Sequence, residues 1–566
     1  MNKEAIFHMP DSKFCFAADE KTVVLRLRTS KSDKFDYVGV IYGSKYEFHE
    51  KQHEQELKKQ YTDNYFDYYI TQISLDDVRF VYIFKIVENG IVNYYCEEGI
   101  SQEYDFSLAY MNAFQLPYIN FADIHHVVPW MRKAVFYEIF IDRFYRGDLN
   151  KKDDYINLKW GEIPNPKSFA GGDLKGITQK LDYLKDLGIN ALYLTPIFCS
   201  ISNHKYDIYD YFNVDPQFGG NEAFKDLVNQ AHRAGIRIVL DGVFNHCSEL
   251  LPQFQDVLKN GKNSPYFDWF IIRGEKPDPK NLNYECFSSC SYMPKFNTSN
   301  PDVQKFLLDI AVYWIKEYDI DGWRLDVSDE VSHDFWRVFR KTVKQVKEDC
   351  VIIGENWHDA YPYLHGDQYD SIMNYAFTKA NMDFFVKGSI SSQEFAERLS
   401  RILMCNTDQV NFMMLNLLDS HDTLRFLTQL NEKTDKLICA LAVMFMFVGV
   451  PCIYYGTEIG MVGGYDPDCR RTFDWQKADK ETPLFSITKA LINLKSRSEL
   501  VYGQIRLSSY NDLFILERFY QNKKLRLTLN NGLDNKSYSS EGTVLVSHNL
   551  ISEKLNSFGF VIEEVE

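Results

Sequence analysis

From Ala134 onward, short apolar strands alternate with amphipathic helices, and this alternation limits the possible folds more than any other feature of the chain. We expect strands at 135–139, 189–194, 236–240, 322–327, 351–354, 371–375, 412–418 and 452–455. The clearest helices are expected at 177–187, 221–234, 303–318, 333–347 and 437–447, with Asn221 capping the second of them. Eight strand–helix units favour a closed parallel barrel over an open sheet. The sequence therefore predicts the α/β class and a (β/α)8 TIM barrel.

Three segments do not follow this alternation. Residues up to about 123 contain β-branched and aromatic runs such as Thr22–Arg28, which are typical of an N-terminal β-sandwich. A long insert interrupts the barrel after its third strand, and we expect this inserted domain at the rim, where it walls the active site. Strand-like runs also follow the barrel and predict a small C-terminal all-β domain. The predicted divisions are 1–123, 124–245, 246–300, 301–498 and 499–566.

Charge and cysteine usage narrow the function classes. The chain has 79 acidic and 63 basic residues and a formal net charge of -16, which argues against nucleic acid or an anionic membrane as a partner. The first residues lack the apolar core of a secretory signal, and no apolar run reaches membrane-spanning length. The eleven scattered cysteines are expected to be free thiols. We therefore expect a cytoplasmic protein.

Acids and histidines follow four of the predicted barrel strands. They lie in Asp241–His246 after the third strand, at Arg324 and Asp326 in the fourth, at Glu355 after the fifth and in Asp419–Asp422 after the seventh. Side chains at the carboxyl ends of barrel strands point toward the substrate. A single Asp–Arg or Asp–His pair is more often structural than catalytic. Four strand ends with compatible polar groups make coincidence a poor explanation.

These acids suit glycoside hydrolysis. A retaining enzyme needs a nucleophilic carboxylate and, about 5 Å away, a carboxylic acid that protonates the leaving oxygen. Asp326 is the better nucleophile, because Arg324 would hold it ionised with a lowered pKa. Glu355 has a longer side chain and an apolar neighbour, Trp357, which would favour the protonated form. Asp422 could then brace the sugar as positive charge builds on its ring.

Four segments resemble the signature regions of the α-amylase family, in the order and spacing of that family. They are Asp241–His246, Gly322–Asp326, Gly354–Trp357 and Leu418–Thr423. The resemblance extends from Ala134 to about Trp475. Within the family, Met293–Asn297 in the insert is similar to a marker of the neopullulanase, cyclomaltodextrinase and maltogenic amylase group, and so are the N-terminal module and the stretch 466–471.

This resemblance implies that Asp326 is the nucleophile, Glu355 the acid/base and Asp422 the transition-state stabiliser of a retaining α-glucan hydrolase. Such an enzyme cleaves α-1,4 and some α-1,6 bonds in cyclodextrins, pullulan and maltodextrins, with transfer to sugars as a second outcome, and uses no organic cofactor. The N-terminal module resembles a starch-binding domain that also builds a homodimer. The expected substrate contacts are His204, Tyr206, His246, Arg324, Trp357, His421, Asp468 and Arg470.

Some members of this group bind calcium near the first barrel loop. Oxygen ligands are available here from five residues, which suits a hard cation: Asp148, Asn150, Asp153, Gly171 and Asp173. Arg146 stands where an asparagine is usual, and Lys151 and Lys152 add positive charge beside the site. We nevertheless expect calcium to bind there.

Two alternatives stay open at this point. A transglycosylase or isomerase acting on small α-glucosides would use the same scaffold, and Asn356, where relatives usually have an aliphatic residue, leaves the balance of hydrolysis and transfer open. A glucan-binding protein on an inactive barrel is the non-enzymatic alternative, and the intact Asp326, Glu355 and Asp422 argue against it.

Overall fold

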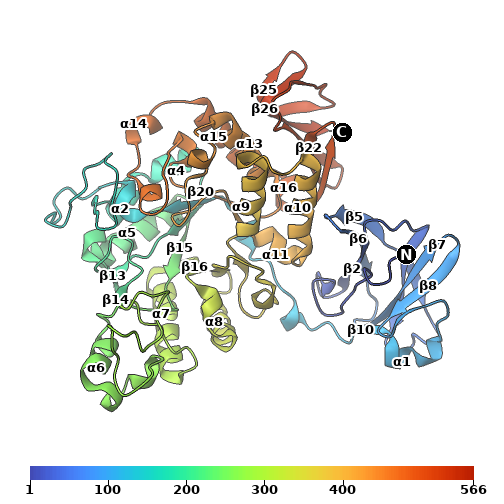
Figure 1. The fold of residues 1–566 in the computed structure, drawn as a ribbon, viewed down its shortest axis with the longest axis horizontal. Coiled ribbons are helices and arrows are strands. Elements are labelled where there is room, and N and C mark those ends of the chain that lie inside the picture. Colours follow the sequence, from blue (N-terminus) through green and yellow to red (C-terminus); the bar gives the residue numbers. More distant parts are fainter. Residues whose placement is uncertain (566) are drawn as a thin grey trace.

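The computed structural model describes residues 1–565, and a closed parallel barrel forms its centre (Figure 1). Its eight strands lie in the order β18-β17-β16-β15-β12-β11-β20-β19. They are β11 (Phe136–Ile139), β12 (Ala191–Leu194), β15 (Arg237–Gly242), β16 (Gly322–Leu325), β17 (Val351–Gly354), β18 (Ser371–Ile372), β19 (Leu415–Leu417) and β20 (Val450–Tyr454). A parallel bridge between Met373 and Leu415 joins the two ends of this order and closes the ring. The predicted α/β barrel is confirmed.

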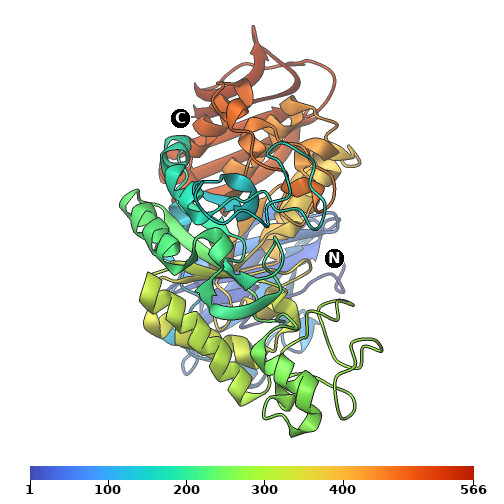
Figure 2. The same cartoon turned by 90° about the vertical axis from the view of Figure 1, so that its left-hand side faces the viewer.

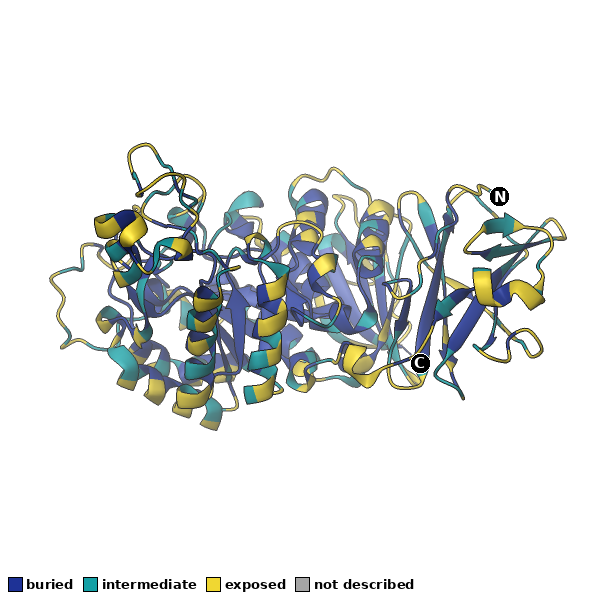
Figure 3. Cartoon of the chain, turned by 90° about the horizontal axis from the view of Figure 1, so that it is seen from below, coloured by how far each residue is buried: buried dark blue, intermediate teal, exposed yellow. Residues whose placement is uncertain are grey.

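Helices cover the outside of the barrel. Figure 3 shows buried strands inside and helices whose outer faces are exposed, which is the arrangement expected of parallel strands covered on both faces. In the helix at 333–346, one apolar face is buried and includes Phe335, Phe339 and Val343. The helices are α2 (Ile141–Phe144), α3 (Leu174–Gln179), α4 (Leu181–Leu187), α5 (Gly220–Arg233), α7 (Pro301–Tyr318), α8 (His333–Val346), α9 (Tyr375–Asn381), α10 (Ser392–Met404), α11 (Asp408–Met413), α12 (Phe426–Gln429), α13 (Thr434–Met446), α14 (Trp475–Ala478), α15 (Pro483–Leu494) and α16 (Ser498–Tyr502).

The repeats are less regular than predicted. The expected helix 177–187 is divided at Lys180 into α3 and α4. The first two residues of the expected seventh strand, 412 and 413, are the end of α11, and β19 has only three residues. The segment between β17 and β18 contains only the short turn η8 (Tyr361–Tyr363). The prediction that Asn221 caps α5 is wrong, because the helix starts one residue earlier and the Asn221 side chain accepts a hydrogen bond from the Val214 N–H (2.7 Å).

The N-terminal module consists of two antiparallel sheets. Alternate residues of β2 and β7, among them Leu25, Leu27, Tyr82 and Phe84, pack into one core between them. One sheet contains β1 (Cys15–Ala17), β2 (Thr22–Ser30), β6 (Phe66–Ser74) and β5 (Lys58–Thr62). The other contains β4 (His53–Glu56), β3 (Tyr37–Ser44), β7 (Phe80–Glu88), β8 (Ile91–Cys96), β9 (Gly99–Ser101) and β10 (Phe114–Leu116), which the short helix α1 (Ala109–Asn112) precedes. The predicted N-terminal sandwich is confirmed.

The C-terminal part of the chain forms one antiparallel sheet beside the barrel (Figure 1). Arg518 of this sheet is fully buried and donates to the carbonyl oxygens of Met446 (3.1 Å) and Leu500 (3.1 Å), which fixes the sheet against the last barrel helices. The strands are β21 (Gln504–Tyr510), β22 (Leu513–Tyr520), β23 (Lys523–Asn530), β24 (Lys536–Ser537), β25 (Thr543–Ile551) and β26 (Lys554–Val565). In the described part of the chain, no helix has both the length and the apolar character needed to cross a bilayer.

The insert after β15 lies at the end of the molecule that is farthest from the N-terminal module, as the two side views agree (Figures 1 and 2). It contains the helix α6 (Pro252–Asn260), and backbone bridges between His246 and Lys295 and between Phe270 and Phe296 close it on itself at the barrel rim. Next to it, the hairpin of β13 (Phe198–Ser200) and β14 (Ile208–Val214) follows β12. These two additions rise above the carboxyl ends of the strands.

Candidate active site

A cavity of about 540 Å³ opens at the carboxyl ends of the barrel strands. The barrel contributes carboxylates, histidines and aromatic residues to its wall, and the insert contributes one side of it, as predicted for a rim insert. The lining residues are His204, Tyr206, His246, Phe287, Cys290, Tyr292, Met293, Asp326, Val327, Asp329, Glu330, Glu355, Trp357, Asp422, Asp466 and Arg470.

One arginine brings the two central carboxylates together. Arg324 lies in β16 and is fully buried, and its Nη1 is 3.0 Å from Asp326 Oδ1 while its Nη2 is 2.9 Å from Glu355 Oε2. The same Nη1 contacts Asp241 at 3.1 Å. We call these four residues the arginine cluster. Because Asp326 and Glu355 meet at one guanidinium group and both line the cavity, they can flank a single glycosidic bond, as a retaining mechanism requires.

The ionisation of this pair differs from the sequence expectation. We expected Arg324 to lower the pKa of Asp326. Burial and the charge of Glu355 outweigh the arginine and raise the pKa of Asp326 well above its ordinary value, so this expectation is wrong. Burial also raises the pKa of Glu355, as expected, against the opposing effect of Arg324. Two buried like charges favour a state in which the pair holds one proton.

A strained backbone position and an aromatic pair hold the Glu355 side chain. Val327 has a φ of 45°, which is costly for a β-branched residue, and its N–H donates to Glu355 Oε2 at 3.0 Å. The Trp357 indole N–H donates to the other oxygen at 3.2 Å, and its ring stacks on Tyr375 with centroids 3.6 Å apart. About half of the surface of Trp357 is exposed, and the residue lines the cavity.

Asp422 belongs to a second charged group that lines the same cavity. Arg470 Nη2 lies 3.2 Å from Asp422 Oδ1, and His421 Nε2 lies 3.1 Å from Asp422 Oδ2. Burial opposes ionisation, but the charges of His421 and Arg470 outweigh it and lower the pKa of Asp422. Burial would lower the pKa of His421, yet Asp422 and Glu138 raise it overall. Asp422 therefore stays a carboxylate.

Tyr206 and two histidines form the wall that follows β12 and β15. The Tyr206 hydroxyl hydrogen-bonds Asp241 Oδ2 (2.8 Å) and His421 Nε2 (2.6 Å), which fixes its ring at the edge of the cavity. Burial lowers the pKa of His204 to about 4 and that of His246 to about 3. Both rings are thus neutral near pH 7, and His246 Nε2 has no protein partner. These groups can hydrogen-bond sugar hydroxyls without adding charge.

The structure brings most of the predicted site residues together. Arg324 and His421 lie directly behind the cavity wall, in contact with residues that line it. Asp468 is turned away, because both of its oxygens pair with Arg471 (2.7 and 2.9 Å). Asp466 lines the cavity instead and pairs with Arg470 at 2.9 Å.

Sequence reasoning missed three further residues. Asp466 lies beside Arg470, which was predicted to contact the substrate. Glu138 is a buried acid inside the apolar strand β11. Because a buried charge is unusual in such a strand, the sequence could have indicated that this residue has a role in the site. The Glu138 carboxylate accepts a hydrogen bond from His421 Nδ1 at 2.5 Å. Tyr375 follows β18 and belongs to no recognisable motif.

Asn356 does not line the cavity. It is buried, and its Oδ1 accepts a hydrogen bond from Ser328 Oγ at 3.2 Å.

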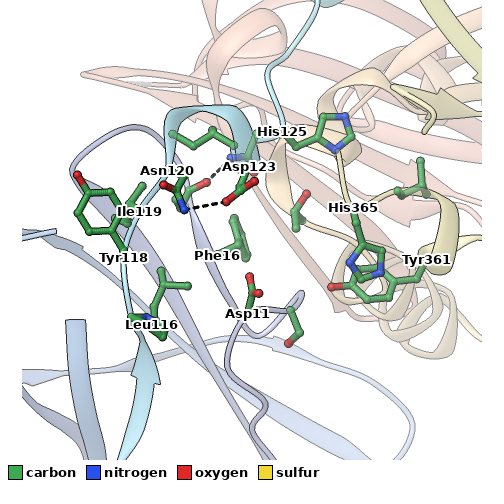
Figure 4. Close-up of a pocket in the computed structure, with 17 residues that line it drawn as sticks. Asp11, Phe16, Leu116, Tyr118, Ile119, Asn120, Asp123, His125, Tyr361 and His365 are labelled. Carbon is green, nitrogen blue, oxygen red and sulfur yellow. Dashed lines mark hydrogen bonds between the residues drawn. The ribbon is translucent and has the colours of Figure 1, made fainter. Parts of the chain in front are cut away.

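A second cavity, of about 350 Å³, lies between the N-terminal module and the barrel (Figure 4). Its carboxylates, Asp11 and Asp123, come from segments outside the barrel strands, and Asp123 accepts from Asn120 Nδ2 at 3.0 Å. No pair of acids on one arginine lines it. The glycosidic chemistry therefore belongs to the cavity at the barrel mouth.

Several of the five expected calcium ligands are engaged with partners inside the protein. Asp148 Oδ1 accepts from the Asn150 N–H (3.1 Å), and Asp153 pairs with Arg146 (3.2 Å). Asp173 is buried at the start of α3. Within residues 1–565, no group of three or more His, Cys, Asp or Glu side chains is arranged to hold a metal ion.

Comparisons with known proteins identify the family of the chain. The model of the alpha amylase catalytic domain matches residues 138–522, and that of the alpha amylase N-terminal ig-like domain matches residues 1–120. A cyclomaltodextrinase of Thermoanaerobacter pseudethanolicus is 45% identical over 538 residues, covering 94% of this chain and 93% of that protein. An intracellular maltogenic amylase of Bacillus subtilis is 41% identical, covering 94% and 92%.

A solved structure of a cyclomaltodextrinase superposes with a TM-score of 0.92 at 36% identity and covers 100% of both chains. The match thus includes the N-terminal module, the barrel, the insert and the C-terminal sheet. The resemblance inferred from the sequence is confirmed: the chain belongs to the alpha amylase family and is a glycoside hydrolase of the cyclomaltodextrinase, maltogenic amylase and neopullulanase type.

Proposed function

We propose that this enzyme hydrolyses α-1,4 glucosidic bonds, and some α-1,6 bonds, in cyclodextrins, pullulan and maltodextrins with retention of configuration. One observation carries the proposal: Asp326 and Glu355 meet at the Arg324 guanidinium group on the wall of the cavity at the barrel mouth. The names of the relatives support the substrate class. The raised pKa of both acids supports a pair that shares one proton.

In the first step, Asp326 attacks the anomeric carbon and the bond from that carbon to the glycosidic oxygen breaks. Glu355 gives its proton to the departing oxygen, which leaves as a sugar hydroxyl. In the second step, Glu355 takes a proton from water while the water oxygen attacks the anomeric carbon and displaces Asp326. Arg324 contacts both acids and so holds them in place during both steps.

Asp422 stabilises the positive charge of the two transition states. Its lowered pKa keeps the carboxylate ionised, and Arg470 holds it at 3.2 Å so that it faces the ring without becoming a second nucleophile. Tyr206 offers its ring to the sugar on the non-reducing side of the bond. A sugar hydroxyl that replaces water in the second step gives transfer, which is the same chemistry with another acceptor.

Location and assembly are part of the proposal. A cytoplasmic enzyme is supported by the Bacillus subtilis relative, which is named intracellular, and by eleven cysteines that are all free thiols. A homodimer follows from the family resemblance of the N-terminal module. Sedimentation of the purified enzyme tests this expectation directly.

Asp326→Asn tests the assignment of the nucleophile. We expect kcat on β-cyclodextrin to fall by about 10⁴-fold or more, because the neutral amide cannot form the glycosyl-enzyme. Asp334→Asn, a change of the same kind at an exposed position of α8, is the matched control and keeps full activity. Proton NMR of the first products of the wild-type enzyme must show the α-anomer. A β-anomer, or an active Asp326→Asn enzyme, contradicts the mechanism.

A further inference from the structure

The loop between α2 and α3, which follows the first barrel strand, encloses a buried ammonium group. Lys151 Nζ donates to the carbonyl oxygens of Gly171 (2.7 Å) and Gln217 (2.9 Å) and pairs with Asp173 Oδ2 at 2.9 Å. Only 9% of the Lys151 side chain is exposed. An ammonium group has three N–H bonds and no acceptor, so these three oxygens satisfy it fully.

The oxygens around this group do not fit a calcium ion. Calcium takes about six to eight oxygen ligands at roughly 2.3–2.6 Å. Two of the expected ligands, Gly171 and Asp173, already accept from the lysine. The other oxygen of Asp173 accepts from the Gly176 N–H at 2.7 Å and so caps α3. Asp153 is drawn outward to Arg146, a second cation of the same loop.

We propose that the Lys151 ammonium is a tethered cation that takes the place of the calcium ion expected from the family resemblance, and that the folded enzyme is therefore independent of calcium. The buried carboxylate of Asp173 and two inward carbonyl oxygens need a positive charge between them, because unpaired buried oxygens are costly. The lysine supplies this charge from within the chain.

The tethered cation also braces the cavity wall. Gln217 lies in the short turn η4 (Pro216–Phe218), and its side-chain oxygen accepts from Lys205 Nζ at 2.6 Å. Lys205 is almost fully buried and pairs with Asp215 at 2.8 Å. The next residue is Tyr206, which lines the cavity. Lys151 thus supports, through Gln217, the loop that carries Tyr206. We call Lys151, Lys205, Asp173, Asp215 and Gln217 the lysine cluster.

Calcium binding and thermal stability of the full-length enzyme test the proposal. For the wild type, we expect no heat of calcium binding by titration calorimetry and the same melting temperature with added CaCl2 or with excess EDTA. Lys151→Ala exposes the three oxygens and should lower the melting temperature by about 2–4 °C, the shift that a loss of about 3–5 kcal/mol produces in a chain of this size. Added CaCl2 should restore part of this loss, and MgCl2, which demands a stricter octahedral geometry, should restore less.

Lys152→Ala is the matched control, because it removes the neighbouring lysine, whose side chain is 84% exposed. It should melt with the wild type. The proposal is overturned if the wild type binds calcium and melts higher with it, or if Lys151→Ala is as stable as Lys152→Ala. If Lys151→Ala does not fold, the calcium titration of the wild type still decides, since it needs no variant.

Discussion

The arginine cluster and the lysine cluster lie at the same rim of the barrel, and their charges are balanced in opposite ways. In the arginine cluster, one guanidinium group contacts three carboxylates. In the lysine cluster, each ammonium group pairs with one carboxylate, and backbone or amide oxygens complete its hydrogen bonds. The first cluster has an excess of negative charge, while the second is neutral.

This difference separates function from structure. Burial, together with the excess negative charge, raises the pKa of Asp326 and Glu355. Asp326 Oδ2 is also buried without a hydrogen-bond partner. Such an arrangement costs stability and is kept where chemistry needs it. The lysine cluster has matched partners, so its removal should cost stability first. Substitutions in the two clusters should therefore affect different measured quantities.

Glu355→Gln should give the largest effect in the comparison. Removal of the acid should lower kcat on maltotriose by about 10³-fold, since general acid catalysis contributes about 10²–10⁴. For a maltoside with a nitrophenol leaving group, kcat/KM should fall far less, because cleavage of this bond needs no proton, whereas kcat should stay low because Glu355 is also the base of the second step. The melting temperature should not fall, because the variant removes one of the repelling charges.

The pH profile of the same variant sharpens this test. Activity of the wild type requires the proton of Glu355, so activity is lost as the pH rises through its raised pKa. Glutamine cannot lose a proton, and the alkaline limb should disappear from the remaining rate. Glu348→Gln, at an exposed turn, is the control and keeps both limbs. An unchanged alkaline limb in Glu355→Gln would mean that another group is the acid.

Lys205→Met should show the opposite behaviour. It leaves the carboxylate of Asp215 buried without its cation, which typically costs about 3–5 kcal/mol and should lower the melting temperature clearly. The catalytic acids are untouched, so kcat should change less than KM, through the displaced Tyr206. Lys225→Met, on the exposed side of α5, should melt with the wild type. A stable Lys205→Met enzyme with a large loss of kcat would break the comparison.

The sequence was sufficient for the barrel and for the acids of the two central strands. Strand periodicity and the ends of strands are local signals, and they placed Asp326 and Glu355 correctly in one cavity. Charge balance is not local. The direction of the Asp326 pKa shift depends on burial and on the charges of Glu355 and Asp241, which come from neighbouring strands. In the sequence, Lys151 likewise looked like added charge beside an ion site, and the proposal that it takes the place of the ion depends on its hydrogen bonds to Gly171 and Gln217 in the structure.

The smallest expected effect tests a position where prediction and structure differ. The family resemblance selected Asp468 as a sugar contact, whereas Asp466 lines the cavity and pairs with Arg470. Asp466→Asn should raise KM for maltotriose by about tenfold with kcat almost unchanged, the loss expected for one charged hydrogen bond. Asp468→Asn should change KM less, because its carboxylate is already paired with Arg471. If the two variants exchange these effects, Asp468 turns into the cavity when sugar binds, and the sequence was the better guide at this position.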